Sequence, residues 1–195
     1  AIETLLSPVC PTGVMDVVIG PAQMVLQVHE SIGHALELDR ILGDERNYAG
    51  TSFVKINDFG SLRWGPEILN VVIDPTVEGE VCSAGFDDEG LEAKKTPLIE
   101  AGLLTRGIGG ALSAQRLSRS EDAIAVSRAC SWNRPPIDRM ANLNVEPGDT
   151  SLDDLIGAVE KGVWLDANSS WSIDDQHVRV HDVFDVWVLH FDGHL

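Results

Sequence analysis

Residues 22–42, AQMVLQVHESIGHALELDRIL, decide the fold of this 195-residue chain. Apolar side chains recur in this segment at the spacing of an amphipathic helix, at Met24, Val28, Ile32, Ala35, Leu36 and Leu38. Pro21 stands in the first turn, where a helix tolerates proline, and Gly43 follows the last apolar residue as a stop signal. The pattern therefore predicts one helix from about Ala22 to Leu42.

This helix carries two histidines and a glutamate in the order His29-Glu30-Ser31-Ile32-Gly33-His34. Neutral imidazole nitrogens bind Zn²⁺ well. A neighbouring carboxylate can take a proton from water as it attacks a carbonyl. The pattern is typical of metal-dependent hydrolysis, and the alternative is a chance occurrence in a chain with six histidines.

The spacing of the two histidines requires an irregular helix. Five residues of a regular α-helix rotate by about 500°, which leaves His29 and His34 about 140° apart around the axis. Both rings reach one ion only if the helix is locally widened or broken. Because π-bulges and glycine kinks are the usual causes, we expect the irregularity near Gly33.

The rest of the chain favours strands over helices. Alternating or β-branched runs predict a buried strand at 15–19, strands at 69–74 and 139–145, and a hairpin over 97–104. A short helix is expected within 107–118, and Ser151 with Asp154 forms a capping pattern that predicts a helix ending at Gly162. From Val163 onward an antiparallel meander is expected. The fold class is α+β, with largely antiparallel strands, a metal-binding helix and one further long helix, and no domain boundary is evident.

Composition and charge narrow the classes of function. The chain is 44% apolar, with 14 Lys and Arg against 31 Asp and Glu, so the formal charge is 14 − 31 = −17. A folded acidic protein is expected, without nucleic-acid or anionic-membrane contacts, since those need basic residues. The sequence has no apolar run of membrane-spanning length and no signal-peptide pattern, which favours a cytoplasmic location. The three widely spaced cysteines, Cys10, Cys82 and Cys130, are expected to be buried reduced thiols.

The histidine segment closely resembles a known family. Residues 29–43 and 49–54 resemble the TldD subunit of the TldD/PmbA metallopeptidase family, once described as modulators of DNA gyrase. The resemblance continues over nearly the whole chain, in residues 87–90, 98–104, 136–142, the Gly148 turn before the Ser151 helix, 171–174 and 192–195. The segment that contains the His-Glu-x-x-x-His motif makes the resemblance specific.

The resemblance implies a zinc-dependent peptidase whose metal is held by both motif histidines and one cysteine. Carried over by position, His29 and His34 are the metal ligands and Glu30 is the catalytic general base. The family's cysteine lies beyond Leu195, in a glycine-rich stretch, and Cys82 and Cys130 precede that position. Residues 1–195 are therefore expected to be the central, catalytic part of a TldD-like metallopeptidase, truncated at both ends.

The resemblance also implies a substrate and a partner. Small or unfolded peptides are the expected substrates, held by pairing with an exposed strand edge. A homodimer, or a heterodimer with a PmbA/TldE-like subunit that lacks the motif, is the expected assembly. The alternative is a non-catalytic scaffold or regulatory subunit of such a complex.

Several residues keep more than one interpretation. Glu37 is a third metal ligand, an acceptor for an imidazole N–H, or a solvated glutamate on the helix face. The acidic residues 87–89 form a cation site or a solvated turn. Arg139 and Asn142 either hold a loop or touch a peptide.

The remaining features are expected to be structural. The glycine-rich residues 107–110 predict a turn rather than a phosphate-binding loop. Surface or turn positions are expected for His177, His181, His190 and His194. Core or interface positions are expected for Trp64, Trp132, Trp164, Trp171 and Trp187.

Overall fold

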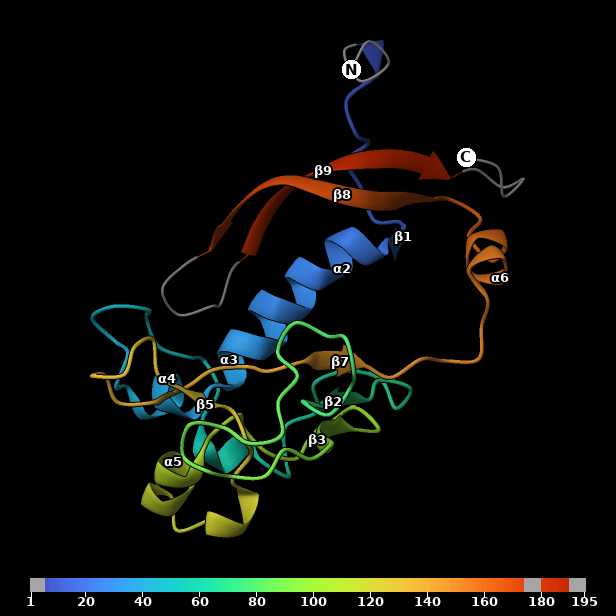
Figure 1. The fold of residues 1–195 in the computed structure, drawn as a ribbon. Coiled ribbons are helices and arrows are strands. Elements are labelled where there is room, and N and C mark those ends of the chain that lie inside the picture. The colour runs from blue at the N-terminus through green and yellow to red at the C-terminus, as the bar shows by residue number, and fades with distance from the viewer. Residues whose placement is uncertain (1–5, 174–179, 190–195) are drawn as a thin grey trace. The chain divides into compact units, whose positions relative to one another are not determined.

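The computed structural model describes residues 6–173 and 180–189 (Figure 1). The chain divides into two compact units, and one boundary falls between Leu26 and Gln27, inside the predicted helix. The first unit combines the described parts of Ala1–Leu26, Asp149–Ser172 and His181–Leu195, and the second consists chiefly of Gln27–Gly148. The sequence gives no sign of this boundary because the apolar helical pattern continues through it without a change in composition.

A three-stranded sheet with the order β1-β8-β9 organises the described part of the first unit. β1 (Asp16–Ile19) runs parallel to β8 (Gly162–Ile173), and β9 (Val180–Leu189) is the other neighbour of β8. The strand predicted at 15–19 is present, but it is half-exposed at the end of the sheet rather than buried. The strands predicted after Val163 are present too, although pairing with β1 adds a parallel ladder that the sequence did not indicate.

The helix that follows Ser151 is present but short. α6 (Leu152–Gly157) begins directly after Ser151, whose Oγ accepts a hydrogen bond from the Asp154 N–H at 3.2 Å, as the capping pattern predicts. The helix has six residues and ends five residues before Gly162, so the expectation of a second long helix is wrong. The cause is Val159, which the helical pattern included but which is buried beyond the helix end, just before β8.

The second unit contains a four-stranded antiparallel sheet with the order β4-β3-β2-β7 in the described residues. Its strands are β2 (Val71–Ile73), β3 (Thr96–Glu100), β4 (Leu103–Leu104) and β7 (Leu143–Val145). The strand that ends before Asp74 and the hairpin over 97–104 are confirmed. At the hairpin turn, Ala101 and Gly102 have φ values of 46° and 75°, as a type I′ turn requires of its two central residues.

The strand predicted over 139–145 is interrupted. β6 (Ile137–Asp138) pairs antiparallel with β5 (Ser127–Arg128), and β7 begins only after a gap of four residues. Within the gap, the Asn142 side chain accepts a hydrogen bond from the Cys82 N–H at 2.8 Å. The polar side chains of the gap, those of Arg139 and Asn142, bind partners outside a strand ladder.

Short helices complete the second unit. α5 (Ala111–Arg116) lies within the predicted range of 107–118. Two short 3₁₀ helices are also present, η2 (Ile56–Asp58) and η3 (Ser120–Asp122). No helix among the described residues is long and apolar enough to cross a membrane.

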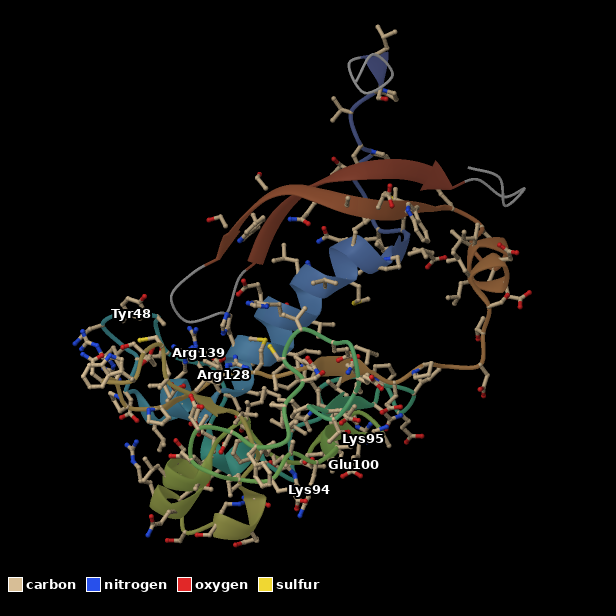
Figure 2. The ribbon with its side chains drawn as sticks, viewed as in Figure 1. Tyr48, Lys94, Lys95, Glu100, Arg128 and Arg139 are labelled. Atoms are coloured by element: carbon tan, nitrogen blue, oxygen red, sulfur yellow. The ribbon has the colours of Figure 1, made fainter. Side chains whose placement is uncertain are left out.

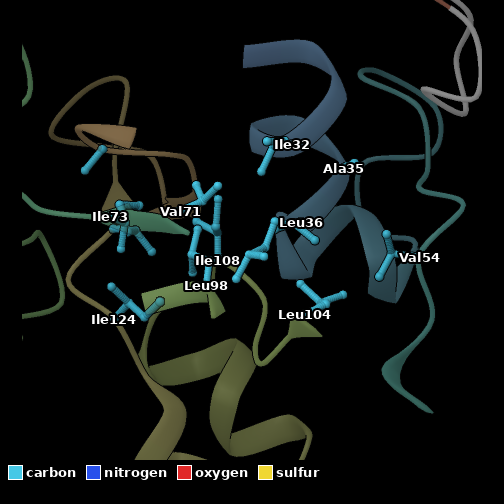
Figure 3. Packing of buried hydrophobic residues seen from close by; sticks show 13 residues of the cluster. Ile32, Ala35, Leu36, Val54, Val71, Ile73, Leu98, Leu104, Ile108 and Ile124 are labelled. Atoms are coloured by element: carbon cyan, nitrogen blue, oxygen red, sulfur yellow. The ribbon is translucent and has the colours of Figure 1, made fainter. Parts of the chain in front are cut away.

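Buried side chains from the helical segment and the sheet form a common core (Figure 3). Ile32, Ala35 and Leu36 of the helical segment pack with sheet and loop residues that include Val71, Ile73, Leu98, Ile99, Leu104, Ile108, Ile124 and Val126. Leu36, Ile73 and Leu98 are fully buried. The core thus fixes the histidine-bearing segment against the sheet.

Candidate metal centre

The predicted helix is regular at its start and widened at the motif. α2 (Pro21–Gln27) leads into a π-helix, η1 (Val28–Gly33), and then into the short α3 (His34–Leu36). The backbone N–H of His34 donates to the carbonyl oxygen of His29, which is the five-residue hydrogen bond of a π-helix. This bond sets residues five apart one above the other, so the predicted widening is confirmed.

Gly33 contributes space rather than a kink. Its φ of −55° and ψ of −69° are helical values open to any residue. A Cβ atom at this position would come within 2.5 Å of the Met140 Sδ and 3.3 Å of a Leu143 methyl carbon. A Cβ at this position would displace the end of the Met140 side chain, because the segment before β7 packs directly against the π-helix.

The widened helix brings the two imidazoles together. The Nε2 atoms of His29 and His34 lie 2.9 Å apart, and the rings are nearly perpendicular at 86°. A carboxylate oxygen of Glu30 lies 3.8 Å from the His29 Nε2, and one potential ligand atom from each of the three residues fits within 4.8 Å. The side chain of His29 is 47% exposed and that of Glu30 is 9% exposed, so the group opens to solvent at His29.

The donor set suits a zinc ion. Zinc binds imidazole nitrogens at 2.0–2.1 Å, so two tetrahedral nitrogen ligands stand about 3.3 Å apart. A small rotation of one ring would increase the distance between the two Nε2 atoms from the observed 2.9 Å to that value. Burial and the neighbouring His34 ring lower the pKa of His29 below its ordinary value, which favours the neutral, metal-binding form.

Glu37 is buried and contacts the second histidine. Its side chain is fully buried, and its Oε2 lies 2.9 Å from the His34 Nδ1. A carboxylate accepts hydrogen bonds only, so this contact favours a proton on Nδ1 and a lone pair on Nε2. The structure thus contradicts the solvated-glutamate interpretation and supports that of an imidazole N–H acceptor.

The chain leaves the helix at Glu37, which explains the burial of its side chain. The residue has extended dihedrals (φ −63°, ψ 121°) and pairs with Ile108. The Ile108 N–H donates to the Leu36 oxygen at 2.7 Å, and the Leu38 N–H donates to the Ile108 oxygen at 2.8 Å. A Cβ at Gly109 would come within 2.2 Å of Leu38, so the glycines of the predicted 107–110 turn allow this close approach.

Beyond the break the helix resumes as α4 (Leu38–Leu42). It ends at Gly43, whose φ of 85° is the left-handed conformation that glycine adopts at helix ends, as predicted.

Two arginines surround Glu37. The Arg40 Nε donates to the Glu37 Oε2 at 2.6 Å, and the Arg139 Nη1 lies 3.7 Å from the same oxygen. Arg139 also binds Asp39 at 3.0 Å and Glu45 at 2.8 Å. Of its two interpretations, the described contacts show Arg139 holding a buried charge cluster together.

The cluster shifts two carboxyl groups in opposite directions. Burial by itself would raise the pKa of Glu37, but the hydrogen bond from His34 and the charges of Arg40 and Arg139 lower it below its ordinary value. Burial, together with the carboxylates of nearby Asp138, Glu37 and Glu45, raises the pKa of Asp39 to about 7 despite the attraction of Arg139.

The acidic turn at residues 87–89 has a third role, which the sequence did not indicate. Its carboxylates accept backbone N–H groups from Ser127 at 3.1 Å, Ala129 at 2.7 Å and Ala111 at 2.6 Å. The turn therefore anchors β5 and the start of α5. Asp88 is nevertheless exposed, so the turn is also partly solvated.

The other predicted residues lie apart from this centre. Cys10 and Cys130 are exposed, which contradicts the expectation of buried thiols, and Cys82 is half-buried. None of the cysteines joins the metal-capable group, which is His29, Glu30 and His34 in the described residues. Trp64 packs against the core, whereas Trp132 is 97% exposed.

Several predicted positions cannot be compared with the structure. His177, His190 and His194 lie outside the described residues, as do the side chains of His181 and Trp187.

Comparison with known proteins relates the chain to a family described as metallopeptidases. The family described as the PmbA/TldA metallopeptidase C-terminal domain matches residues 12–179. A metalloprotease of Methanocaldococcus jannaschii is 32% identical over 174 residues, which cover 89% of this chain and 36% of the relative. A protein of Saccharolobus solfataricus, named zinc metalloprotease TldD homolog, is 29% identical over 154 residues, 78% of this chain and 32% of its own length.

Solved structures share the fold at low sequence identity. A putative modulator of a DNA gyrase from Thermotoga maritima superposes with a TM-score of 0.79 at 16% identity, over 96% of this chain and 40% of its own. TldE from Thermococcus kodakarensis gives a TM-score of 0.76 at 17% identity, over 92% of this chain and 39% of its own.

The chain spans about a third of the length of the two curated relatives. The family match nevertheless covers most of the chain, including the π-helix and the four-stranded sheet. This chain therefore belongs to the PmbA/TldA metallopeptidase family.

Proposed function

We propose that this chain supplies the metal-binding part of a zinc-dependent peptidase. In this proposal, His29 and His34 hold the ion through Nε2, and Glu30 is the general base. The observation that carries it is the π-helix, which sets the two Nε2 atoms 2.9 Å apart where a regular helix would separate them. The names of the metalloprotease relatives support the same chemistry.

The roles of the residues follow from their chemistry. When bound, zinc supplies a Lewis acid that polarises a peptide carbonyl and makes nearby water more acidic. Glu30 lies beside the histidine pair and accepts the proton of the attacking water on its carboxylate, then delivers it to the leaving amine. His34 keeps its Nε2 lone pair toward the site because its Nδ1 faces Glu37.

The finer parts of the proposal rest on family resemblance. A catalytic zinc site has three protein ligands, and we propose that a cysteine following Leu195 in the full-length protein is the third. Small or unfolded peptides are the proposed substrates, in the cytoplasm. Likeness in fold to TldE is consistent with a dimer that includes a TldE-like subunit, although at 17% identity it shows the fold alone.

Replacement of the proposed base tests this function in the full-length protein. Glu30→Gln keeps the size of the side chain but cannot accept the proton, so bound zinc should stay stoichiometric while peptide hydrolysis falls by about a hundredfold or more. His34→Ala should lose both zinc and activity. Glu100→Gln, at an exposed position in the β3–β4 hairpin, is the matched control and should change neither.

Metal analysis and a peptide-cleavage assay read out all three variants. Undiminished cleavage by the Glu30 variant contradicts the assignment of the base. A folded full-length protein that holds no zinc and cleaves no peptide favours the scaffold alternative.

A further inference from the structure

We propose that Glu37 and Arg139 are positioning residues that hold His34 in its metal-binding orientation. Glu37 keeps the imidazole proton on Nδ1, and Arg139 keeps Glu37 in place from a segment about a hundred residues further along the chain. This inference rests on the proposed function, because it concerns the affinity of the same zinc site. It adds that zinc affinity depends on residues that do not touch the metal.

The Glu37 carboxylate is fixed by donors on both of its oxygens. Oε2 accepts from the Arg40 Nε at 2.6 Å and faces the His34 Nδ1 at 2.9 Å. Oε1 accepts from the backbone N–H of Met140 at 3.2 Å. A carboxylate held on both sides cannot rotate away from the imidazole, so it determines the plane of the His34 ring.

Arg139 connects this carboxylate to two other acidic side chains. Its Nη1 lies 3.0 Å from Asp39 and 3.7 Å from Glu37, and its Nη2 lies 2.8 Å from Glu45. The same Nη1 donates to the backbone oxygen of Asp138 at 2.6 Å. The guanidinium therefore ties the segment between β6 and β7 to α4 and to Glu37, the residue that directly follows α3.

One contact supports a competing arrangement. The Arg40 Nη2 lies 3.1 Å from the His34 Nδ1, and an unprotonated Nδ1 would accept from it. Such an Nδ1 would turn a lone pair toward the closer Glu37 oxygen, and two acceptors repel. The shorter distance to an acceptor-only carboxylate therefore favours the proton on Nδ1.

The position of the proton can be measured without metal. In zinc-free, full-length protein labelled with ¹⁵N-histidine, long-range ¹H–¹⁵N spectra should show His34 protonated on Nδ1, the minor tautomer of a free neutral histidine. Glu37→Leu removes the acceptor and should shift the ring toward Nε2–H. A wild-type His34 that carries its proton on Nε2 overturns the inference.

Zinc affinity gives the second readout, measured by competition with a chelator. Replacing groups that orient a ligating histidine lowers metal affinity about ten- to a hundred-fold, and we expect that range for Glu37→Leu. Arg139→Gln should weaken zinc binding about tenfold, and Arg139→Lys, which keeps the charge, should restore part of the loss. Should Glu37→Leu fail to fold, Glu37→Gln keeps the shape and one acceptor oxygen and should show a smaller loss.

Arg128 provides a matched control for Arg139 (Figure 2). It is exposed and donates from Nη2 to the backbone oxygen of Met140 at 2.7 Å, so it contacts the same segment through that oxygen. Arg128→Gln should leave zinc affinity unchanged. Equal affinities for folded wild type, Arg139→Gln and Glu37→Gln overturn the inference, whereas a wild type that binds no zinc refutes the proposed metal centre instead.

Discussion

Asp39 shows how the buried charge cluster is balanced at the scale of single residues. Three carboxyl groups, those of Glu37, Asp39 and Glu45, surround two guanidinium groups, those of Arg40 and Arg139. One negative charge is therefore in excess if every group is ionised. The pKa of Asp39 rises to about 7 as a result, because burial and the neighbouring carboxylates disfavour its charged form.

This shift predicts a pH-dependent contribution to stability. A carboxyl group whose pKa is 3.8 when unfolded and about 7 when folded contributes stability that is fully present below pH 3.8 and is lost as pH rises through about 7. The wild type should therefore lose stability between pH 5 and pH 8 through Asp39, whereas Asp39→Asn should not. The free energy of unfolding of Asp39→Asn, relative to that of the wild type, should rise over this range. Urea unfolding of the zinc-free protein at both values measures the difference.

The comparison isolates Asp39 from its neighbour. Glu37, whose pKa is lowered from 4.5, contributes stability that is lost only as pH falls below the range from pH 5 to pH 8, so its titration does not enter the comparison. A stability difference between variant and wild type that stays constant from pH 5 to pH 8 contradicts the prediction.

At the scale of elements, the β3–β4 hairpin depends on one glycine. Gly102 has a φ of 75°, and a Cβ there would lie 2.3 Å from the Gly65 oxygen and 2.5 Å from the Pro66 oxygen. Gly102→Ala should therefore destabilise the protein by about 2–3 kcal/mol, through strain and a clash with backbone that cannot move aside. Denaturant midpoints measure the loss.

A substitution at Gly60 separates the conformational strain from the steric clash. The φ of Gly60 is similar at 79°, but a Cβ there meets nothing within 4 Å. Gly60→Ala should cost only the conformational strain, about 1 kcal/mol. Equal losses for the two variants would show that the contact with residues 65 and 66 does not matter.

Local signals account for the elements that the sequence predicts well. The helical apolar spacing, the Gly43 stop and the glycine-containing hairpin are each specified by neighbouring residues, and the His29 to His34 spacing itself requires a widened helix. The early end of α6 was missed because the apolar pattern continues through Val159 into the approach to β8.

Long-range pairing accounts for most of what the sequence could not show at the site. Arg139 and Asp39 are a hundred residues apart, and nothing local connects them. One usable signal existed for Glu37, which stands between Leu36 and Leu38 in the apolar stripe and three residues before Arg40. A charged residue so placed is buried only with a partner, which points to an ion pair.

At the scale of the whole molecule, the two proposed histidine ligands and the proposed base lie in one of the two units. His29, Glu30 and His34 all belong to the unit built on Gln27–Gly148. A ligand that binds only the folded state, present at a free concentration a hundred times its Kd, stabilises that state by about 2.7 kcal/mol. The stabilisation is expected first where the ligand is held, because regions of a protein open locally with different free energies.

Hydrogen exchange should reveal this difference. Zinc should slow exchange of the amides in η1 and α3 by up to about a hundredfold and leave those of β1 and the first residues of β8 nearly unchanged. His34→Ala should abolish the effect. Equal protection in both units upon zinc addition contradicts the assignment of the site to one unit.

The break at Glu37 limits how this metal site can be moved to another protein. Copying the six motif residues onto a designed regular helix would return the histidines to opposite sides of the axis. It would also omit Glu37, whose carboxylate is buried where the chain turns to pair with Ile108. The smallest portable unit therefore includes the widened turn, the break, the glycine-flanked segment 107–109 and the segment with Arg139 and Met140. A graft needs three pieces of chain rather than one.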